Sequence, residues 1–380
     1  MPQFGLDNVL IGIVFFIFAL QCLLIAREVN NKKKKEMNEE NKEHFREGAY
    51  NGLLTSIILV AIGLLFFVPG LIVALVNNNI QAAIELPYPV PIATFAVYFL
   101  GFLFMFIAVF VVYEYFTKKY LTTPPPKQKI HKLDLEVSRK AYHILIIGIL
   151  AVYLIVGTVI TDTLYAFLSG DAYSYYGYAT ADLSVIDGGK LWVMFGVMVI
   201  FEFCILTDLI RVKAPRWYPA RLMSSMYREK EKETLGPHVY LLAGILFAVI
   251  VFPAPIAMAV IAVSGLGDAV ATIVGVTTGK HKIRPKVSKK SWEGCIAGMI
   301  ASFVFGFIAF IAVAFIPEYI GLVGTIGRGI VIGLVINAVA VPVFFLIDYF
   351  TPSPLPFSDN LLNPLLIGFT MWGVYLLFTI

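Results

Sequence analysis

The stretch from Ser264 to Gly298 holds the densest chemistry in the chain, with one acid followed by six cations. Asp268 stands among small residues inside an apolar segment, and the next loop carries Lys280, Lys282, Arg284, Lys286, Lys289 and Lys290. A carboxylate inside a membrane segment is costly and usually faces protein or water. A dense cationic loop suits a polyphosphate, whose charge needs several donors and commonly a divalent metal. The pattern therefore predicts a nucleotide site at a membrane surface.

The composition is that of a membrane protein. Hydrophobic residues make up 59% of the chain and charged residues 14%, and the mean hydropathy is +0.83, which excludes an ordinary soluble domain. With roughly 20 apolar residues for each crossing of a bilayer, the sequence predicts an all-α, polytopic membrane protein of about ten transmembrane helices. The expected spans are 8–26, 52–76, 93–116, 141–168, 191–210, 236–252, 255–276, 293–316, 327–347 and 361–379.

The loops between these spans sort by charge. Four of them, 27–47, 117–140, 211–235 and 277–292, contain 27 of the 29 Lys and Arg residues. The positive-inside rule then predicts that these loops are cytosolic and that both termini lie outside. A stiff proline-rich linker, TTPPPKQK, suggests a boundary between an accessory region of three helices, 1–130, and a catalytic region of seven helices, 131–380.

Ionisable residues at the ends of other predicted spans add to this site. Asp208 and Arg211 are three residues apart, so on a helix they share a face and can pair. The loop before the last span has no Lys or Arg, and its two acids could form a metal-binding counterpart to the basic loop. The predicted topology brings the following residues near one membrane face, whereas random helix caps would be divided between both faces: His143, Asp208, Arg211, His238, Asp268, Glu293, Asp348 and Asp359.

A purely structural interpretation of the same residues remains open. The glycines before Asp268 suit close helix packing, and Asp268 itself can be satisfied by a nearby hydroxyl such as that of Ser264 or Thr272. His143 can form a local hydrogen bond, and the run 358–360 can cap the last helix.

Four segments carry a resemblance to a known family: SRKAYHI at 138–144, GPHVYLLAG at 236–244, GLGDAVATIVG with KKSWEG within 265–294, and SDNLLNPL at 358–365. With these motifs, residues from about 131 onward resemble the polyprenol kinases, which include dolichol kinase and phytol kinase. That group is related to the phosphatidate cytidylyltransferases, whose C-terminal signature, rich in Gly, His and Asp, is not found here. The first 130 residues are not well covered by the resemblance.

The resemblance implies transfer of phosphate from CTP to the hydroxyl of a long isoprenoid alcohol, with Mg²⁺ or another divalent cation. It implies that Asp268 is the metal-binding acid. The chemistry of phosphoryl transfer adds Asp359 as a second metal ligand and Asp359 or His143 as the acceptor of the hydroxyl proton, so the expected catalytic residues are Asp268, Asp359 and His143. The nucleotide contacts that we expect are Lys280, Lys282, Lys289, Lys290, Ser291, Glu293, Gly294, Arg139 and Asn360.

Two other functions stay open at this stage. A cytidylyltransferase would make a CDP-lipid and pyrophosphate from related motifs. A secondary transporter would also suit many spans with buried acids, although no repeat between two halves is visible in the sequence. The lipid alcohol, the oligomeric state and the membrane, either a prokaryotic plasma membrane or an internal one such as the ER, are left open. No nucleic-acid partner is expected.

Overall fold

The computed structural model describes residues 2–36, 38–75, 143–156, 185–213, 218, 227, 229–285, 290–314, 324–351 and 355–379, with single positions 101, 105, 109 and 112. Helices account for about 89% of this part of the chain, and no strand occurs within it. The chain divides into two compact units, one formed by Met1–Gln128 with Gly157–Ala243 and the other by Lys129–Val156 with Gly244–Ile380. The predicted all-α class is therefore confirmed.

Seven helices within the described ranges are long and apolar enough to cross a membrane, which makes the chain a multi-pass membrane protein. They span Asn8–Lys35, Asn41–Leu75, Trp192–Lys213, Ala254–Thr277, Trp292–Ala314, Ile326–Phe350 and Asp359–Phe378. The expected span 236–252 corresponds to a shorter helix, α10 (Pro237–Val251). The expected span 93–116 lies largely outside the described residues, and of the expected span 141–168 only residues 143–156 are described. The count of ten, the side of the termini and the division at residue 130 stay predictions.

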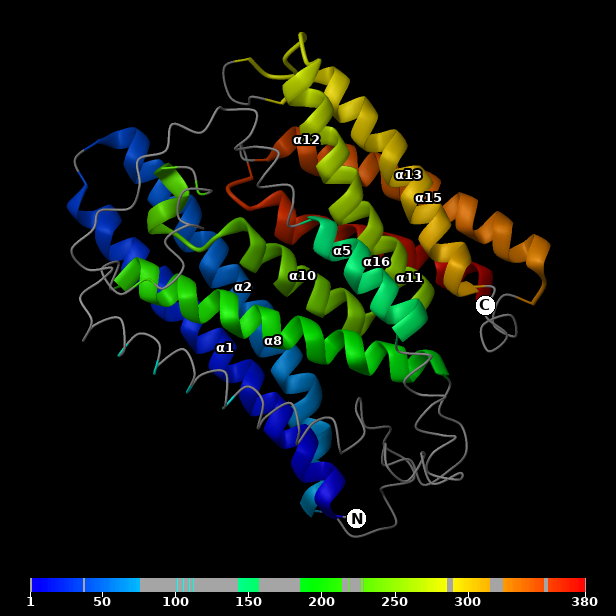
Figure 1. Cartoon of the computed structure of the whole chain (residues 1–380), viewed down its shortest axis with the longest axis horizontal. Coiled ribbons are helices and arrows are strands. Elements are labelled where there is room, and N and C mark those ends of the chain that lie inside the picture. Colours follow the sequence, from blue (N-terminus) through cyan, green and yellow to red (C-terminus); the bar gives the residue numbers. More distant parts are fainter. Residues whose placement is uncertain are drawn as a thin grey trace. The chain divides into compact units, whose positions relative to one another are not determined.

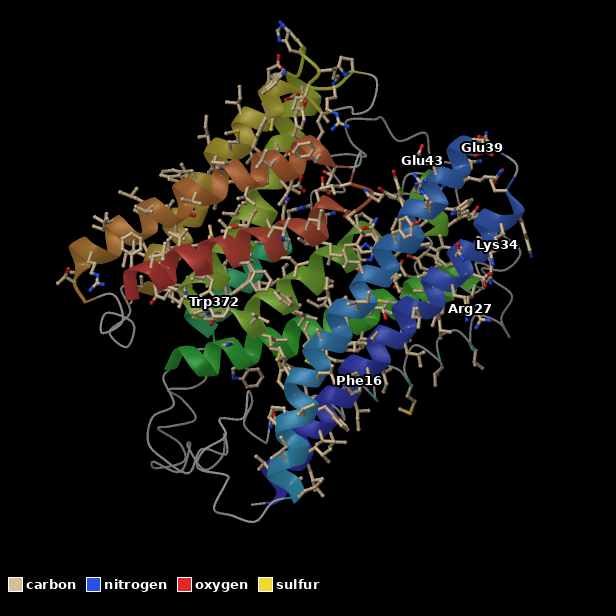
Figure 2. All side chains as sticks on the ribbon, turned by 180° about the vertical axis from the view of Figure 1, so that it is seen from behind. Phe16, Arg27, Lys34, Glu39, Glu43 and Trp372 are labelled. Atoms are coloured by element: carbon tan, nitrogen blue, oxygen red, sulfur yellow. The ribbon has the colours of Figure 1, made fainter. Side chains whose placement is uncertain are left out.

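The first unit is built on a helical hairpin, in which α1 (Pro2–Lys35) and α2 (Glu39–Leu75) lie side by side (Figure 1). Phe15 stacks on Phe66 with ring centroids 5.7 Å apart. Arg27, Lys34, Glu39 and Glu43 gather toward the end where the two helices are joined (Figure 2). The charged end of the hairpin is thereby separated from its apolar length.

Helix α8 (Val185–Lys213) packs against α1 in the same unit. Phe18 meets Phe201 edge to face at 5.3 Å, and the Gln21 amide donates a hydrogen bond of 3.1 Å to the buried Glu202 carboxyl group. A buried acid in an apolar helix is expensive unless it is bonded. The Gln21 contact therefore partly satisfies Glu202 and fixes how α1 and α8 align.

The second unit contains the chemistry-bearing segments. Its elements are α5 (Ile144–Ala151), the π-helical turn η2 (Val152–Val156), α11 (Ala254–Ala262), the π-helical turn η5 (Val263–Gly267), α12 (Asp268–Thr277), α13 (Trp292–Ala314), α15 (Ile326–Phe350) and α16 (Asp359–Thr379). Every residue of α11 is buried, as expected for a helix that is apolar all round. The helix from Ala254 to Thr277 is thus anchored in the protein before it reaches Asp268.

A seam of small residues joins α12 to α13, which lie side by side and are connected by a hairpin, here named the basic hairpin (278–291) (Figure 1). A Cβ atom on Gly294 would lie 2.6 Å from the Ala271 carbonyl oxygen, and one on Gly298 would lie 2.6 Å from the Ala271 side chain. The two backbones are therefore too close for larger residues, as in small-xxx-small membrane packing. The seam consists of Gly267, Ala271 and Gly275 on one helix and Gly294, Gly298 and Ser302 on the other.

The other side of α13 presents large apolar side chains, exposed at four-residue intervals. These are Trp292, Ile296, Ile300, Val304 and Ile308. Exposed apolar side chains along a membrane-spanning helix face lipid, because no water is present there to penalise them. We call this set the lipid-facing stripe of α13. The seam and the stripe together fix how α13 is rotated about its axis.

Candidate functional site

Asp268 is the first residue of α12 and follows the π-helical turn η5 directly. Single π turns inside α-helices are rare and are often found at functional sites. Asp268 is 7% exposed, and its Oδ2 atom lies 3.2 Å from Nε2 of His143, the residue that precedes α5. This is an ion-pair distance, although its alignment falls short of a hydrogen bond. The structure thus brings together two of the three expected catalytic residues.

Of the two hydroxyls expected as structural partners of Asp268, that of Ser264 does not bond to it. Ser264 is buried in η5, and its hydroxyl has no hydrogen-bond partner within the described ranges. The carboxylate of Asp268 instead faces an imidazole that comes from a distant part of the sequence. Asp268 therefore meets a titratable partner, as a catalytic role requires.

Lys290 forms the second part of the cluster. Its ammonium group donates to Asp348 Oδ1 at 2.8 Å, to Asp359 Oδ2 at 2.9 Å and to the Thr351 hydroxyl at 3.3 Å. Asp348 stands in the last turn of α15 and Asp359 starts α16, so one side chain ties two helix ends to the basic hairpin. Burial would lower the pKa of the Lys290 ammonium, but the charges of Asp359 and Asp348 outweigh it and hold the pKa above its ordinary value.

The two parts are electrostatically connected, because the Asp348 carboxylate interacts with the charges of both Asp359 and Asp268. We call Asp268, His143, Lys290, Asp348 and Asp359 the acidic cluster. Its described members, which are three carboxyl groups, one imidazole and one ammonium group, all belong to the second unit.

Each carboxylate oxygen of Asp359 accepts a hydrogen bond from a different partner. Oδ1 accepts a 3.0 Å hydrogen bond from the backbone N–H of Asn360 at the start of α16, while Oδ2 binds Lys290. The helix-capping and site interpretations of this acid are therefore compatible. Asn360 itself lies beside the cluster through its backbone.

The donor chemistry of the cluster suits a hard cation. Mg²⁺ usually keeps several waters and binds through one or two carboxylates together with substrate phosphates, and carboxylates are what Asp268 and Asp359 offer. No group of three metal-ligating side chains converges within the described part of the chain. Asp268 and Asp359 therefore offer the type of ligand that Mg²⁺ takes together with a substrate phosphate.

The basic hairpin is held by main-chain pairing between its two arms. Lys282 and Ser291 form an isolated bridge, and the Trp292 N–H donates to the His281 carbonyl oxygen at 2.9 Å. Glu293 accepts from His281, with Nδ1 and Oε1 2.6 Å apart. Glu293, expected as a nucleotide contact, is thus occupied in closing the hairpin.

Two other residues that we expect to contact the nucleotide have structural roles. The Ser291 hydroxyl accepts from the Gly294 N–H at 3.3 Å, which caps the start of α13. Gly294 belongs to the small-residue seam, where a side chain would meet the α12 backbone. Lys280 and Lys282 are exposed on the hairpin. Lys289 and Arg139 lie outside the described residues.

An open pocket of about 770 Å³ lies beside the hairpin at the start of α13. Its walls include Lys280, His281, Lys282, Trp292, Glu293 and Ile296. The residues of the acidic cluster are not among its lining residues. The pocket and the cluster are therefore distinct features of the second unit.

The first unit has a polar network of its own. Arg211 donates to Asp208 Oδ1 at 2.7 and 3.1 Å, which confirms the pairing expected from their spacing, and the Gly236 N–H donates to Asp208 Oδ2 at 2.6 Å. The guanidinium also donates to the carbonyl oxygens of residues 231, 232 and 234. His238 packs its ring against Tyr227 at 5.9 Å. The GPH motif thus holds the segment before α10 against the end of α8.

Thr351 was not an expected site residue, and Asp348 was expected only as part of an acidic counterpart to the basic loop. Asp348 is an acid beside a loop without basic residues, but nothing local in the sequence marks it as a partner of Lys290, which is 58 positions away. An acid that ends an apolar helix and faces a basic loop across the predicted membrane surface is the signal that points to it.

Comparison with known proteins adds no assignment. No family model, curated protein or solved structure matches this chain. The site geometry and the motif resemblance are therefore what support a function.

Proposed function

We propose that this protein is a CTP-dependent kinase that transfers phosphate to the hydroxyl of a membrane lipid, with a polyprenol-type isoprenoid alcohol as the substrate class. The observation that supports it most is the acidic cluster. An acid inside an apolar helix, an imidazole beside it and a lysine bound to two further acids come from five different segments of one unit. Phosphoryl transfer asks for this kind of positioning and charge compensation, and little covalent chemistry from the protein.

Each residue has a distinct task in this proposal. Asp268 and Asp359 would hold a divalent metal, which when bound neutralises charge on the phosphate oxygens. Lys290 balances further phosphate charge, and Asp348 positions its ammonium group. The hydroxyl oxygen of the lipid attacks the terminal phosphorus of CTP, the bond to the bridging oxygen breaks, and CDP leaves. His143 or Asp359 accepts the hydroxyl proton.

The location of the cluster supports a lipid substrate. Asp348 and Asp359 stand at the ends of membrane-crossing helices, and Lys290 lies just before another. A lipid tail can stay in hydrocarbon at such a depth while its hydroxyl group reaches a soluble nucleotide. The predicted topology places this surface in the cytosol.

The purified protein in detergent, given radiolabelled CTP, Mg²⁺ and phytol, geranylgeraniol, dolichol or diacylglycerol, provides the test. We expect CDP and a labelled lipid phosphate, and Asp268→Asn should lower the rate by at least about 100-fold. Glu43→Gln also replaces a carboxylate by an amide, at an exposed side chain of the first unit, and should leave the rate unchanged. Release of pyrophosphate would instead indicate a CDP-lipid synthase, and full activity of Asp268→Asn would remove the proposed centre.

A further inference from the structure

The four described cations of the basic hairpin divide between two directions. Lys290 binds Asp348 and Asp359, and Arg284 donates to the Tyr349 carbonyl oxygen at 2.8 Å, so both contact the last turn of α15 or the start of α16. Lys280 and Lys282 instead line the open pocket, together with Trp292. The basic loop is therefore not one uniform phosphate-binding surface.

The floor of the pocket belongs to the lipid-facing stripe of α13. Trp292 is 43% exposed and Ile296 is 52% exposed, and Ile300 continues the stripe one turn further with 61% exposed. Trp292 also stacks on Phe345 of α15 at 5.9 Å, which holds its ring in place. Tryptophan is the residue that typically marks the level of the lipid headgroups. The pocket thus opens along a surface that continues into the hydrocarbon region.

The described residues that line the pocket carry a small positive charge. Lys280 and Lys282 contribute two positive charges and Glu293 one negative charge, with His281 bonded to that carboxylate. A single phosphodiester matches the net charge near one that these described side chains carry. The exposed apolar floor of the pocket also suits an acyl chain, which a nucleotide does not have.

We propose that this pocket binds an anionic phospholipid of the surrounding bilayer. The lipid phosphate lies against Lys280 and Lys282, and one acyl chain runs along Trp292, Ile296 and Ile300. Recognition combines charge attraction to anionic headgroups with burial of the apolar stripe. The proposal is independent of the phosphotransfer activity, because it involves none of the acidic cluster.

Trp292 provides the readout. A variant in which the other tryptophans, Trp192, Trp217 and Trp372, are replaced by Phe is placed in bilayers that contain brominated phosphatidylglycerol or brominated phosphatidylcholine at equal mole fraction. We expect stronger quenching of Trp292 by the anionic lipid. Lys280→Gln with Lys282→Gln should reduce that preference by about fivefold for each lysine.

The matched control removes two exposed cations elsewhere. Lys34→Gln with Lys35→Gln, at the end of α1, changes the net charge equally and should leave the preference of Trp292 for the anionic lipid intact. Native mass spectrometry provides a second measurement that avoids the Phe replacements. It counts the phosphatidylglycerol molecules retained by the chain with all its tryptophans, with and without the Lys280 and Lys282 changes.

Three results would overturn the proposal. The first is equal quenching by the two brominated lipids, and the second is an equal loss of preference in the Lys34 and Lys35 control. The third is displacement of the anionic lipid by CTP at submillimolar concentration, which would assign the pocket to the nucleotide.

Discussion

The change Lys290→Met tests whether the lysine at the centre of the acidic cluster holds the second unit together. Methionine keeps the length of the side chain and removes the ammonium group, so the hydrogen bonds to Asp348 Oδ1 at 2.8 Å and Asp359 Oδ2 at 2.9 Å are lost. Removing one partner of a buried charge pair costs about 3–5 kcal/mol, because the other charge remains buried.

The exposure of the partners sets where in that range the effect falls. Asp359 is 27% exposed and can regain water, whereas Asp348 is 5% exposed and cannot. We therefore expect the free energy of unfolding to fall by about 2–4 kcal/mol, mostly because of Asp348. In the double variant Lys290→Met with Asp348→Asn, at least about 1 kcal/mol of that loss should be recovered.

The measurement is reversible unfolding in mixed micelles with increasing SDS, followed by far-UV circular dichroism. Lys42→Met is the matched control, because it breaks another lysine–carboxylate pair, with Glu39 at 2.6 Å, whose side chains are 35% and 84% exposed. That exposed pair should contribute at most about 0.5 kcal/mol. If Lys290→Met costs no more than Lys42→Met, the cluster does not stabilise the fold and the reasoning is wrong.

The pH dependence of the same variant has a defined sign. The pKa of Lys290 in the folded protein lies above its usual 10.5, because Asp359 and Asp348 outweigh the effect of burial. A raised pKa of a base contributes stability that is complete below the unfolded-state value and is lost only as pH rises through the folded-state value. The difference in unfolding free energy between Lys290→Met and the unaltered chain should therefore stay constant from about pH 7 to about pH 9.5. A difference that shrinks steadily over that interval would mean that Lys290 is not held charged by its two partners.

The remaining predictions concern packing and the polar network of the first unit. Gly294→Ala should destabilise the protein by about 1–3 kcal/mol, because the new Cβ would lie 2.6 Å from the Ala271 carbonyl oxygen. Gly373→Ala, which meets nothing within 4 Å, should be neutral or stabilising by up to about 1 kcal/mol in the same unfolding assay. Arg211→Lys should make the segment 229–236 cleavable by added protease, since lysine cannot reproduce the guanidinium bonds that hold it. Arg46→Lys, in an exposed pair, should leave the cleavage pattern unchanged.

Local periodicity and spacing were sufficient for much of the fold. Long apolar segments predicted the seven described membrane helices, because hydrophobic length is a direct physical requirement of the bilayer. The pair Asp208 and Arg211 was predicted because three residues of separation place both side chains on one helix face. Both inferences depend only on residues that lie close to one another in the sequence.

Contacts between distant segments were harder to predict. The charge distribution placed His143 and Asp268 near one membrane face, but their approach to 3.2 Å depends on how α5 packs against the π-helical turn before Asp268. The charge pattern placed Asp348 and Asp359 at the same surface as Lys290, but it could not assign the individual bonds, because any acid at that surface would satisfy it.

The motif KKSWEG contains residues that have structural roles in addition to the nucleotide contacts expected of them. The resemblance predicts nucleotide contacts for Ser291 and Gly294, which stay predictions, and the structure shows that the same residues form a helix cap and a close packing contact. Both structural uses had their own signals, a serine before an apolar run and glycines at four-residue intervals. A recurring motif can therefore reflect the construction of a helical hairpin as well as the chemistry beside it.

The lysine that joins the basic hairpin to α15 and α16 has a consequence for the way the chain is made. Its two carboxylate partners are 58 and 69 residues further along, so Lys290 leaves the ribosome well before either of them. Until the last two helices are inserted, its ammonium group must wait in water at the membrane surface. The second unit can therefore complete its assembly only after synthesis has reached the final helix, and a chain stopped before Asp348 would carry an uncompensated charge that quality-control proteases could recognise.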